Sequence, residues 1–355
     1  MNVRDELERF RERDWADPDV SGAVRMALVG LGGFTVDSIA PAIERAEHVS
    51  TTVVVSGSKE KATRIADDLD AEHGLTYEEY HDGVASNAYD AVFVGTPNAT
   101  HLEHVETAAR NGKDVLCEKP MEATAERAER MVETCEHAGV TLMIAYRVQT
   151  NPLVRWARYL VREGVIGDPI HCRGSMSQRI FEIIGPDPDQ WRLDQDLSGG
   201  AALIDLGIYP LNTARFLMDA DPESVHAFQR SDGETFSGVD EHISFEASFD
   251  NDALGAFTAS QNSYEQGHLH VTGTEGQIVL SPAFMGPATV RVVTDDIEER
   301  AELESTSELF QEVEYFATCV LAGREPEPNG RHGLIDMRSM DAMYRSASLG
   351  DRITL

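Results

Sequence analysis

Short apolar runs alternate with amphipathic stretches over residues 24–147. Each run is long enough for a strand buried on both faces, and stretches with helical periodicity, such as Ile39–Glu47 and Ala123–Ala138, follow the runs. Strands that alternate with helices predict a parallel sheet with right-handed crossovers. The predicted strands are Val24–Val29, Thr51–Val55, Ala91–Gly95, Val115–Glu118 and Thr141–Ala145. We therefore expect residues 24–147 to form one α/β domain.

The pattern changes after Tyr146, where strand-like runs follow one another directly. The predicted strands are Ile170–Met176, Val225–Phe228, Ile243–Phe249, Ala253–Ser260, His268–Gly273, Gln277–Leu280 and Val290–Thr294. The predicted helices are Pro152–Glu163, Gly207–Leu217, Glu308–Ala322 and Gly333–Ser348. Turn sequences such as Asp250-Asn251-Asp252 join neighbouring runs as in antiparallel hairpins. Residues 148–355 are thus predicted to form an α+β domain with a large, mostly antiparallel open sheet.

The two ends of the chain are expected to serve these domains. Residues 1–23 are charged and predict a short helix followed by an arm. The last predicted helix is a candidate to pack back on the first domain.

A glycine-rich turn, Gly30-Leu31-Gly32-Gly33-Phe34-Thr35, follows the first strand and precedes a helix. Strand, glycine turn and helix in this order are the context of a dinucleotide-binding fingerprint. Gly30 permits the tight turn, and Gly32 lets a pyrophosphate approach the helix N-terminus. Thr35 stands where the fingerprint has Gly or Ala, so a glycine-rich turn without a ligand stays open as an alternative. The first domain is accordingly interpreted as a Rossmann domain.

The second strand ends at Ser56-Gly57-Ser58-Lys59, where a site for NAD would place a carboxylate on the ribose 2′-hydroxyl. The hydroxyls of Ser56 and Ser58 and the ammonium of Lys59 can instead receive a 2′-phosphate. This pattern predicts NADP in preference to NAD. Ser58 can also cap the helix that follows, and the two roles are compatible.

Three further strand ends carry polar groups: Thr96-Pro97-Asn98, Glu118-Lys119-Pro120 and Tyr146-Arg147. Ligands of open α/β sheets bind at the carboxyl ends of the strands. The Lys119 ammonium can there bond a substrate hydroxyl, and Asn98 can bond the cofactor. His101 begins the next helix, where a histidine serves helix packing more often than chemistry. Taken alone, Lys119 is also compatible with a surface position beside a turn.

A second group of residues lies at Gly199-Gly200-x4-Asp205-x3-Tyr209. Asp205 and Tyr209 are four residues apart, so they share one face if the segment is helical. A carboxylate and a phenol aimed at a crevice with a lysine can bind a polyol and transfer a proton, because a nearby ammonium favours the phenolate. The alternative is that Asp205 caps the helix and Tyr209 packs.

Composition narrows the function further. The chain has 62 acidic and 30 basic residues and a net charge of −32, so it would repel nucleic-acid phosphates, and no nucleic-acid partner is expected. The acids are spread along helix faces, which suits a cytoplasm of high salt and indicates a halophilic source. No apolar run reaches the length of a membrane span, and the polar start lacks a signal core, so we expect a cytoplasmic protein. The scattered cysteines indicate no metal or redox motif: Cys117, Cys135, Cys172 and Cys319.

Taken together, the glycine turn, the Glu118-Lys119-Pro120 element and the Asp205-x3-Tyr209 element resemble the Gfo/Idh/MocA oxidoreductases in order and context. Within that family the chain is most similar to haloarchaeal NADP-dependent sugar dehydrogenases. Many members carry His at the position of Tyr209, and the Tyr form argues against an inositol dehydrogenase. The resemblance implies oxidation of an aldose, with D-xylose expected, at C1 to its lactone.

The resemblance also implies roles for single residues. Lys119 and Tyr209 would be the catalytic pair, with Asp205 on the sugar. The expected substrate set is Lys119, Tyr146, Asp205 and Tyr209. The expected cofactor set is Gly30, Leu31, Gly32, Gly33, Phe34, Ser56, Ser58, Lys59, Thr96, Pro97, Asn98, His101, Glu118, Lys119, Arg147, Trp191 and Arg192. No metal is expected, and a homodimer or homotetramer is expected through the C-terminal sheet. A dehydrogenase for another sugar or a dihydrodiol, and a non-catalytic NAD(P)-binding sensor, stay open.

Overall fold

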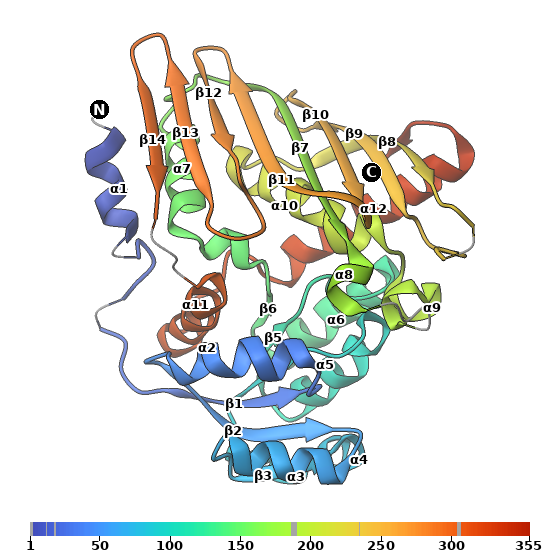
Figure 1. Ribbon diagram of the computed structural model, residues 1–355. Helices are drawn as coiled ribbons and strands as arrows, with labels where there is room; N and C mark the ends of the chain where they lie inside the picture. The colour runs from blue at the N-terminus through green and yellow to red at the C-terminus, as the bar shows by residue number, and fades with distance from the viewer. Residues whose placement is uncertain (1–2, 12, 18, 186–189, 234, 304–306) are drawn as a thin grey trace. The chain divides into compact units, whose positions relative to one another are not determined.

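The computed structural model describes residues 3–11, 13–17, 19–185, 190–233, 235–303 and 307–355 (Figure 1). The chain forms two compact units. We call residues 15–147 and 307–334 the Rossmann unit, and residues 1–14, 148–306 and 335–355 the sheet unit.

The Rossmann unit is built on a parallel sheet of six strands in the order β3-β2-β1-β4-β5-β6. The strands are β1 (Val24–Val29), β2 (Val49–Ser56), β3 (His73–Thr76), β4 (Ala91–Val94), β5 (Asp114–Cys117) and β6 (Leu142–Ile144). This is the doubly wound order of dinucleotide-binding sheets, in which the direction of winding reverses between the first and fourth strands. The predicted parallel α/β sheet is therefore confirmed.

Helices cover both faces of this sheet (Figure 1). They are η1 (Thr35–Ile39), α2 (Ala40–Glu44), α3 (Lys59–Asp68), α4 (Tyr77–His81), η2 (Ser86–Ala88), η3 (Asn98–Thr100), α5 (His101–Arg110), α6 (Ala125–Ala138) and α11 (Glu308–Ala322). α11 returns late in the sequence and packs with α2 against β1 and β2. Its residues Val313 and Phe316 join Met26 and Leu28 in one buried core.

Three strands, β3, β14 and the two-residue β15, escaped the sequence pattern because they lie at sheet edges. β3 contains Gly74 and one buried apolar residue, Leu75, and pairs with β2 alone. β14, in the sheet unit, reads Glu-Glu-Arg-Ala-Glu and pairs with β13 alone. An edge strand needs few apolar residues, and charged side chains protect it from pairing with another chain. Hydrophobic periodicity therefore carries little information at these positions.

The sheet unit is built on nine strands in the order β14-β13-β12-β11-β7-β10-β9-β8-β15. The strands are β7 (Pro169–Arg179), β8 (Pro222–Arg230), β9 (His242–Phe249), β10 (Leu254–Ser260), β11 (Asn262–Gly273), β12 (Gly276–Leu280), β13 (Thr289–Thr294), β14 (Glu298–Glu302) and β15 (Ile353–Thr354). β7 and β10 pair in parallel, and the other pairs are antiparallel. The expected mostly antiparallel open sheet is confirmed.

Helices pack on one face of this sheet (Figure 1). Helices that contact its strands include α7 (Pro152–Arg162), η6 (Ala202–Gly207) and α10 (Ile208–Met218). The other helices in this part of the chain are α1 (Val3–Arg11), η4 (Arg147–Thr150), α8 (Ile180–Ile184), η5 (Trp191–Leu193), α9 (Gln195–Ser198) and α12 (Gly330–Leu349). Gly174 lets α10 lie close to β7, because a Cβ there would come within 2.7 Å of the Pro210 Cβ. The buried Arg215–Asp336 ion pair, at 2.7 Å, joins α10 to α12. In the part of the chain that the structure describes, no helix has the length and apolarity of a membrane span.

Candidate active site

The glycine turn between β1 and η1 has the shape that a dinucleotide requires. Gly30 has φ +93°, and a Cβ there would lie 2.6 Å from the Thr96 methyl and 2.7 Å from the Gly95 carbonyl oxygen. Only glycine fits this approach of β1 to the end of β4. A Cβ on Gly32 would meet open space, so the backbone there is accessible to a ligand. The turn residues therefore fit a bound pyrophosphate at the start of the helix.

Thr35, the departure from the glycine fingerprint, is accommodated by Gly95. In the fingerprint, the last glycine permits close packing of helix and strand. Here the Thr35 hydroxyl occupies that space, since a Cβ on Gly95 would lie only 2.8 Å from it. Thr35 is 1% exposed. Thr35 on the helix is larger than glycine, but Gly95 at the end of the strand has no side chain, so helix and strand still pack closely.

The end of β2 offers hydroxyls and no carboxylate of its own. Ser58 caps α3 by accepting a hydrogen bond from the Lys61 amide, as the sequence predicts for a serine before this helix. Ser56 accepts from the Ser58 amide at 3.3 Å. The Lys59 ammonium lies 2.7–2.8 Å from both Glu79 carboxyl oxygens. Glu79 therefore competes with any ligand phosphate for this ammonium.

His101 ties the ends of two strands together. The ring is fully buried, with Nε2 at 2.8 Å from the Thr96 carbonyl and Nδ1 at 3.4 Å from the Cys117 sulfur. Burial lowers the pKa of His101, which favours the neutral ring. The neutral ring can donate from Nε2 to Thr96 while Nδ1 accepts from the Cys117 thiol. His101 thereby supports the strand ends from inside the unit, as the packing interpretation predicts.

Lys119 and Glu118 follow β5 at its carboxyl end. The Glu118 carboxylate accepts from the Lys119 amide at 3.0 Å, and the Lys119–Pro120 peptide bond is cis. Pro97 precedes the short helix η3, which begins at the buried Asn98. The strand ends of β4 and β5 are neighbours, because Val94 pairs with Cys117. The structure thus brings these two predicted segments together at one edge of the sheet.

The end of β6 carries the remaining site residues of the Rossmann unit. The Arg147 guanidinium donates to Glu308 at 2.6 Å. Tyr146 is 5% exposed and makes an edge contact with His332, at 5.9 Å between ring centroids.

The glycine turn also contains two predicted cofactor residues with large side chains. Leu31 is buried in the turn, whereas Phe34 is 44% exposed.

Glu312, on α11, is a buried carboxyl group that sequence reasoning missed. It is fully buried, and neither carboxyl oxygen has a hydrogen-bond partner among the described residues. Burial, reinforced by the charge of Glu118, raises the pKa of Glu312 well above the usual range, and Arg147 opposes this shift. Burial and the Glu118 charge therefore both favour the protonated form of Glu312. Glu312 stands beside other polar residues on α11, such as Gln311 and Glu314, so nothing in the sequence marked it as the fully buried one.

In the sheet unit, Asp205 lies on η6, a π-helical segment that leads into α10 and Tyr209. Such segments are rare and occur often at functional sites. The buried Asp240 carboxylate accepts from the amides of Ala201 and Leu203 at 2.7 and 2.6 Å and from the Tyr344 hydroxyl at 2.9 Å. These bonds replace the missing partners at the start of the helix.

Gly200 makes room for this anchor. Its φ is +147°, and a Cβ there would overlap the Tyr344 hydroxyl. The glycine pair in the sequence signalled a close approach, but it did not reveal that Tyr344 and Asp240 come from distant segments.

The two predicted reactive side chains of this unit have defined neighbours. Asp205 Oδ2 accepts from the Gln261 amide at 2.9 Å. The Tyr209 ring packs on Phe284, at 5.9 Å between centroids. Phe284 is 2% exposed and has φ +69°, an uncommon conformation for a bulky residue. Trp191 and Arg192 lie on η5, where the guanidinium stacks over the indole ring at 4.5 Å.

One group of described residues could in principle hold a metal: Glu47, His48 and Glu314, whose ligand atoms lie within 4.8 Å of one another. Glu314 Oε2 already accepts from the Glu47 and His48 amides at 3.1 and 3.3 Å. Glu314 thus serves to satisfy the backbone after α2.

The sheet order, the ligand-accessible glycine turn and the polar strand ends define an NAD(P)-binding oxidoreductase fold. The NAD-binding Rossmann model of an oxidoreductase family matches residues 24–146, and the GFO/IDH/MocA C-terminal domain model matches residues 154–279. The chain belongs to the Gfo/Idh/MocA oxidoreductase family.

Similar proteins span the whole chain. It is 45% identical to "D-xylose 1-dehydrogenase [NADP(+)]" of Haloarcula marismortui, with 100% of both chains covered. It is 31% identical to "D-xylose 1-dehydrogenase (NADP(+)) 2" of Haloferax volcanii, over 92% of this chain and 98% of the relative. A solved structure of aldose-aldose oxidoreductase from Caulobacter crescentus, with glycerol, is 31% identical with a TM-score of 0.86. That comparison covers 94% of this chain and 100% of the other.

Glu312→Gln tests the buried acid through stability. The pKa of Glu312 is higher in the folded chain than in the unfolded chain, where a glutamate carboxyl has a pKa of about 4.3. The free energy of unfolding therefore falls as pH rises above that value, and a neutral amide removes this loss. We expect Glu312→Gln to raise the free energy of unfolding at pH 8 by at least about 1 kcal/mol, with the gain vanishing near pH 4.

Urea unfolding in molar KCl at several pH values measures this gain. Glu133→Gln, which removes an exposed carboxylate from α6, is the matched control. A gain that is equal at both pH values would show that Glu312 is ionised in the folded protein.

Proposed function

We propose that the chain is an NADP-dependent dehydrogenase that oxidises an aldose, with D-xylose as the first candidate, at C1 to its lactone. The observation that supports this most is the 45% identity, over the full length of both chains, to a haloarchaeal D-xylose 1-dehydrogenase. The presence of Lys119, Asp205 and Tyr209 agrees with it, because oxidation of a hydroxyl needs a group that takes its proton.

In the proposed mechanism, Lys119 and Tyr209 meet the same sugar hydroxyl. Tyr209 takes the proton of the anomeric hydroxyl, and the Lys119 ammonium stabilises the negative charge that develops on oxygen. Asp205 accepts from a second sugar hydroxyl and orients the ring. NADP⁺, when bound, accepts the hydride that leaves C1. Phe284 supports this role of Tyr209, since it limits the tilt of the phenol ring.

The preference for NADP rests on the end of β2. Ser56, Ser58 and Lys59 offer donors to a 2′-phosphate, and no acid follows the strand directly. In this proposal, the 2′-phosphate takes the Lys59 ammonium from Glu79, an exchange at low cost because exposed ion pairs contribute little.

A different aldose is the second candidate substrate. The likeness to the aldose-aldose oxidoreductase of Caulobacter crescentus supports it, because that relative also covers nearly the whole chain. A sugar panel separates the two candidates and also separates both from a non-catalytic NAD(P)-binding sensor.

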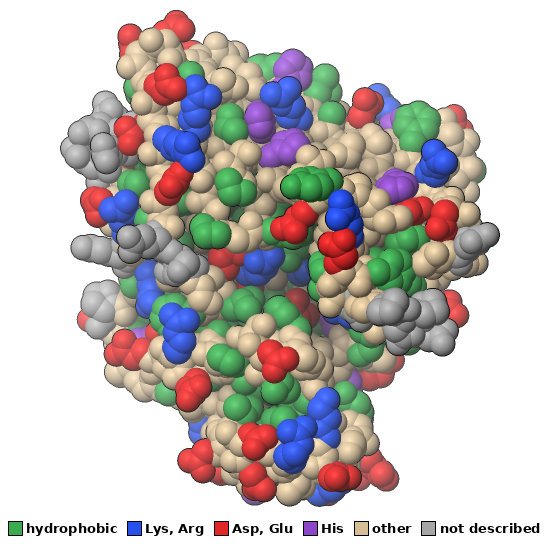
Figure 2. Space-filling model, in the orientation of Figure 1, with side chains coloured by type: hydrophobic (Ala, Val, Ile, Leu, Met, Phe, Trp, Pro, Cys, Tyr) green, Lys and Arg blue, Asp and Glu red, His purple; other side chains and the backbone are tan. Residues whose placement is uncertain are grey.

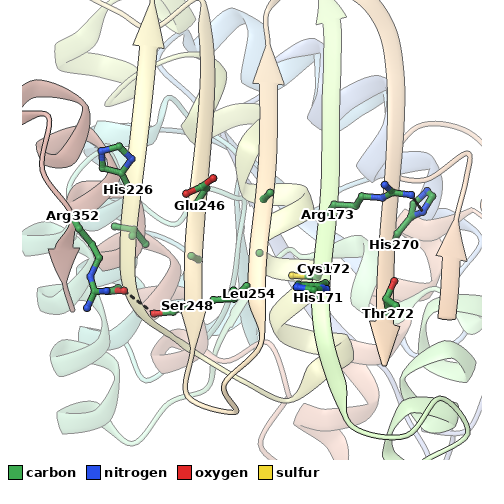
Figure 3. A pocket seen from close by; sticks show the side chains of 15 residues that line it. His171, Cys172, Arg173, His226, Glu246, Ser248, Leu254, His270, Thr272 and Arg352 are labelled. Atoms are coloured by element: carbon green, nitrogen blue, oxygen red, sulfur yellow. Dashed lines mark hydrogen bonds between the residues drawn. The ribbon is translucent and has the colours of Figure 1, made fainter. Parts of the chain in front are cut away.

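We also propose self-association through the outer face of the nine-stranded sheet. A groove of about 620 Å³ lies on this face. Figure 3 shows the side chains that line it, which come mainly from β8, β9, β10, β7 and β11. Its charged and imidazole side chains are His171, Arg173, His226, His270, Arg352 and, as a single acid, Glu246. Figure 2 shows histidine and arginine side chains gathered over part of this sheet. A face with few acids is where two strongly acidic copies repel each other least.

Exposed apolar side chains on the same face agree with self-association. Leu254 is 55% exposed and Phe228 is 66% exposed. A partner that covers these side chains would remove their apolar surface from water, which favours association. The net charge of −32 and the burial of all four cysteines further support a reducing cytoplasm of high salt.

Lys119→Met and Tyr209→Phe test the proposed chemistry. Each change removes a group for proton transfer, so we expect sugar oxidation to fall at least about a hundredfold. The assay follows absorbance at 340 nm with xylose, arabinose, ribose, glucose and galactose, each with NADP⁺ in molar KCl. Lys61→Met and the exposed Tyr264→Phe are matched controls. Near-normal turnover in either test variant removes that residue from its role, and no turnover with any sugar in the unaltered chain refutes the dehydrogenase.

Isothermal titration tests cofactor preference. We expect NADP⁺ to bind at least about tenfold more tightly than NAD⁺, because the 2′-phosphate gains charge-assisted hydrogen bonds. Lys59→Met should narrow this ratio, while Lys61→Met on the same helix should keep it. The lowest salt that keeps the chain folded is the best condition, since salt screens exposed charges. Tighter binding of NAD⁺ would contradict the proposal.

Light scattering in molar KCl tests self-association. Leu254→Glu places a carboxylate at the centre of the groove, and we expect it to lower the measured mass to that of a smaller assembly. Leu349→Glu is the control, because Leu349 is 64% exposed at the end of α12. The proposed interface is wrong if the unaltered chain is a monomer or if Leu254→Glu keeps its mass.

A further inference from the structure

We infer that Gln261 is a positioning residue for Asp205 and that Gln178 fixes the orientation of Gln261. The inference deepens the proposed function and rests on it, since it concerns how the sugar-binding carboxylate is held. Three hydrogen bonds carry it, and all of them lie inside the sheet unit.

Gln261 is held in place by its backbone and by its burial. It lies between β10 and β11, where its amide donates to the Glu241 carbonyl at 3.0 Å and its carbonyl accepts from the Ile180 amide at 2.9 Å. The residue is 1% exposed. The main chain of Gln261 is thus fixed on both sides, and its side chain leaves from a rigid point of the sheet.

The side-chain amide of Gln261 is saturated with partners. Its Nε2 donates to Asp205 Oδ2 at 2.9 Å and to the Ala201 carbonyl at 3.2 Å, while its Oε1 accepts from Gln178 Nε2 at 2.8 Å. Because the Ala201 carbonyl and the Asp205 carboxylate only accept, the nitrogen of Gln261 faces these two groups. Its oxygen then faces β7, where the Gln178 amide donates to it. The chain of two amides therefore presents donors, in one fixed direction, to a carboxylate.

The nature of the last partner separates this network from ordinary packing. Asp205 is partly exposed, lies on the π-helical segment η6, and needs donors because an ionised carboxylate only accepts. The bond to Ala201 ties the same amide to the residue just before η6. Gln261 thus fixes both the segment and the side chain of Asp205. A buried amide oriented toward an acidic ligand-binding group is an arrangement that supports preorganised recognition.

The test compares Gln261→Met, Gln178→Met and Gln261→Glu, with Gln229→Met on the exposed end of β8 as the control. We expect Gln261→Met to raise KM for the sugar by roughly 10- to 100-fold, the scale of one lost hydrogen bond to a charged group. The value of kcat should change less than about threefold, and NADP⁺ affinity by titration should stay the same. Gln178→Met should give a smaller rise in KM of the same sign, because the Gln261 amide can then turn.

The pH dependence of KM in Gln261→Glu separates a positioning role from a purely structural role, because a structural role predicts no such dependence. An ionised carboxylate at this position faces Asp205 without a donor, so sugar binding should be weak at pH 8. Part of it should return toward pH 5, because a protonated carboxyl can donate again. The KM ratio between Gln261→Glu and Gln261→Met should therefore fall as pH falls.

Two results overturn the inference without overturning the proposed function. An unchanged KM in Gln261→Met, with an active enzyme, excludes the positioning role and leaves the proposed function intact. A parallel loss of kcat, NADP⁺ affinity and melting temperature in Gln261→Met, with a pH-independent Gln261→Glu, shows that the network is merely structural. Failure of the unaltered chain to oxidise any sugar is seen without a variant, and it overturns the proposed function together with this inference.

Discussion

The close approach of β1 to the end of β4 is the constraint on which the nucleotide half of the site depends. Gly30 and Gly95 have no side chains where the two strands turn toward their helices, and a Cβ on either would overlap neighbouring atoms. This absence lets the first helix begin beside the strand ends, and a Cβ added at Gly32 in the turn would meet open space. Thr35 fills the room that Gly95 leaves, so the fingerprint is altered in sequence while its packing is retained.

Buried polar groups hold the reactive segments in both units. In the Rossmann unit, His101 links the ends of β4 and β5, and Glu314 satisfies the amides that follow α2. In the sheet unit, Asp240 collects two amides and one phenol at the start of the π-helical segment η6. Buried polar groups are costly unless they are paired, so each such network selects one local geometry. Glu312 differs from these groups, because it is buried and neither of its carboxyl oxygens has a partner among the described residues.

The acidic composition and the folded surface act at different levels. Net charge of −32 describes the solvent that the chain tolerates and is no guide to its chemistry. The groove on the outer sheet face departs from that composition, with one acid among its lining residues. Such a local departure becomes visible only when strands that are distant in sequence are placed side by side.

The sequence by itself determined the main strands of both sheets, the helices between them and the motifs that belong to the family. Val24–Val29 and Glu308–Ala322 were placed at their observed bounds, because burial on one or both faces leaves a clear apolar period. The glycine turn and the Glu118-Lys119-Pro120 element also stand in contiguous sequence. Edge strands such as β3 were missed, since one neighbour requires little apolar surface.

Tertiary structure alone decided the partners of the candidate site residues. Gln261 lies 56 residues from Asp205, and Tyr344 lies 104 residues from Asp240. Glu312 and Glu118 are separated by more than half of the chain. No local period or spacing encodes such pairs, because they depend on which strands become neighbours and on how closely the backbones approach. A hydrogen bond between distant segments is a property of the folded packing, and a single sequence shows only the two ends of it.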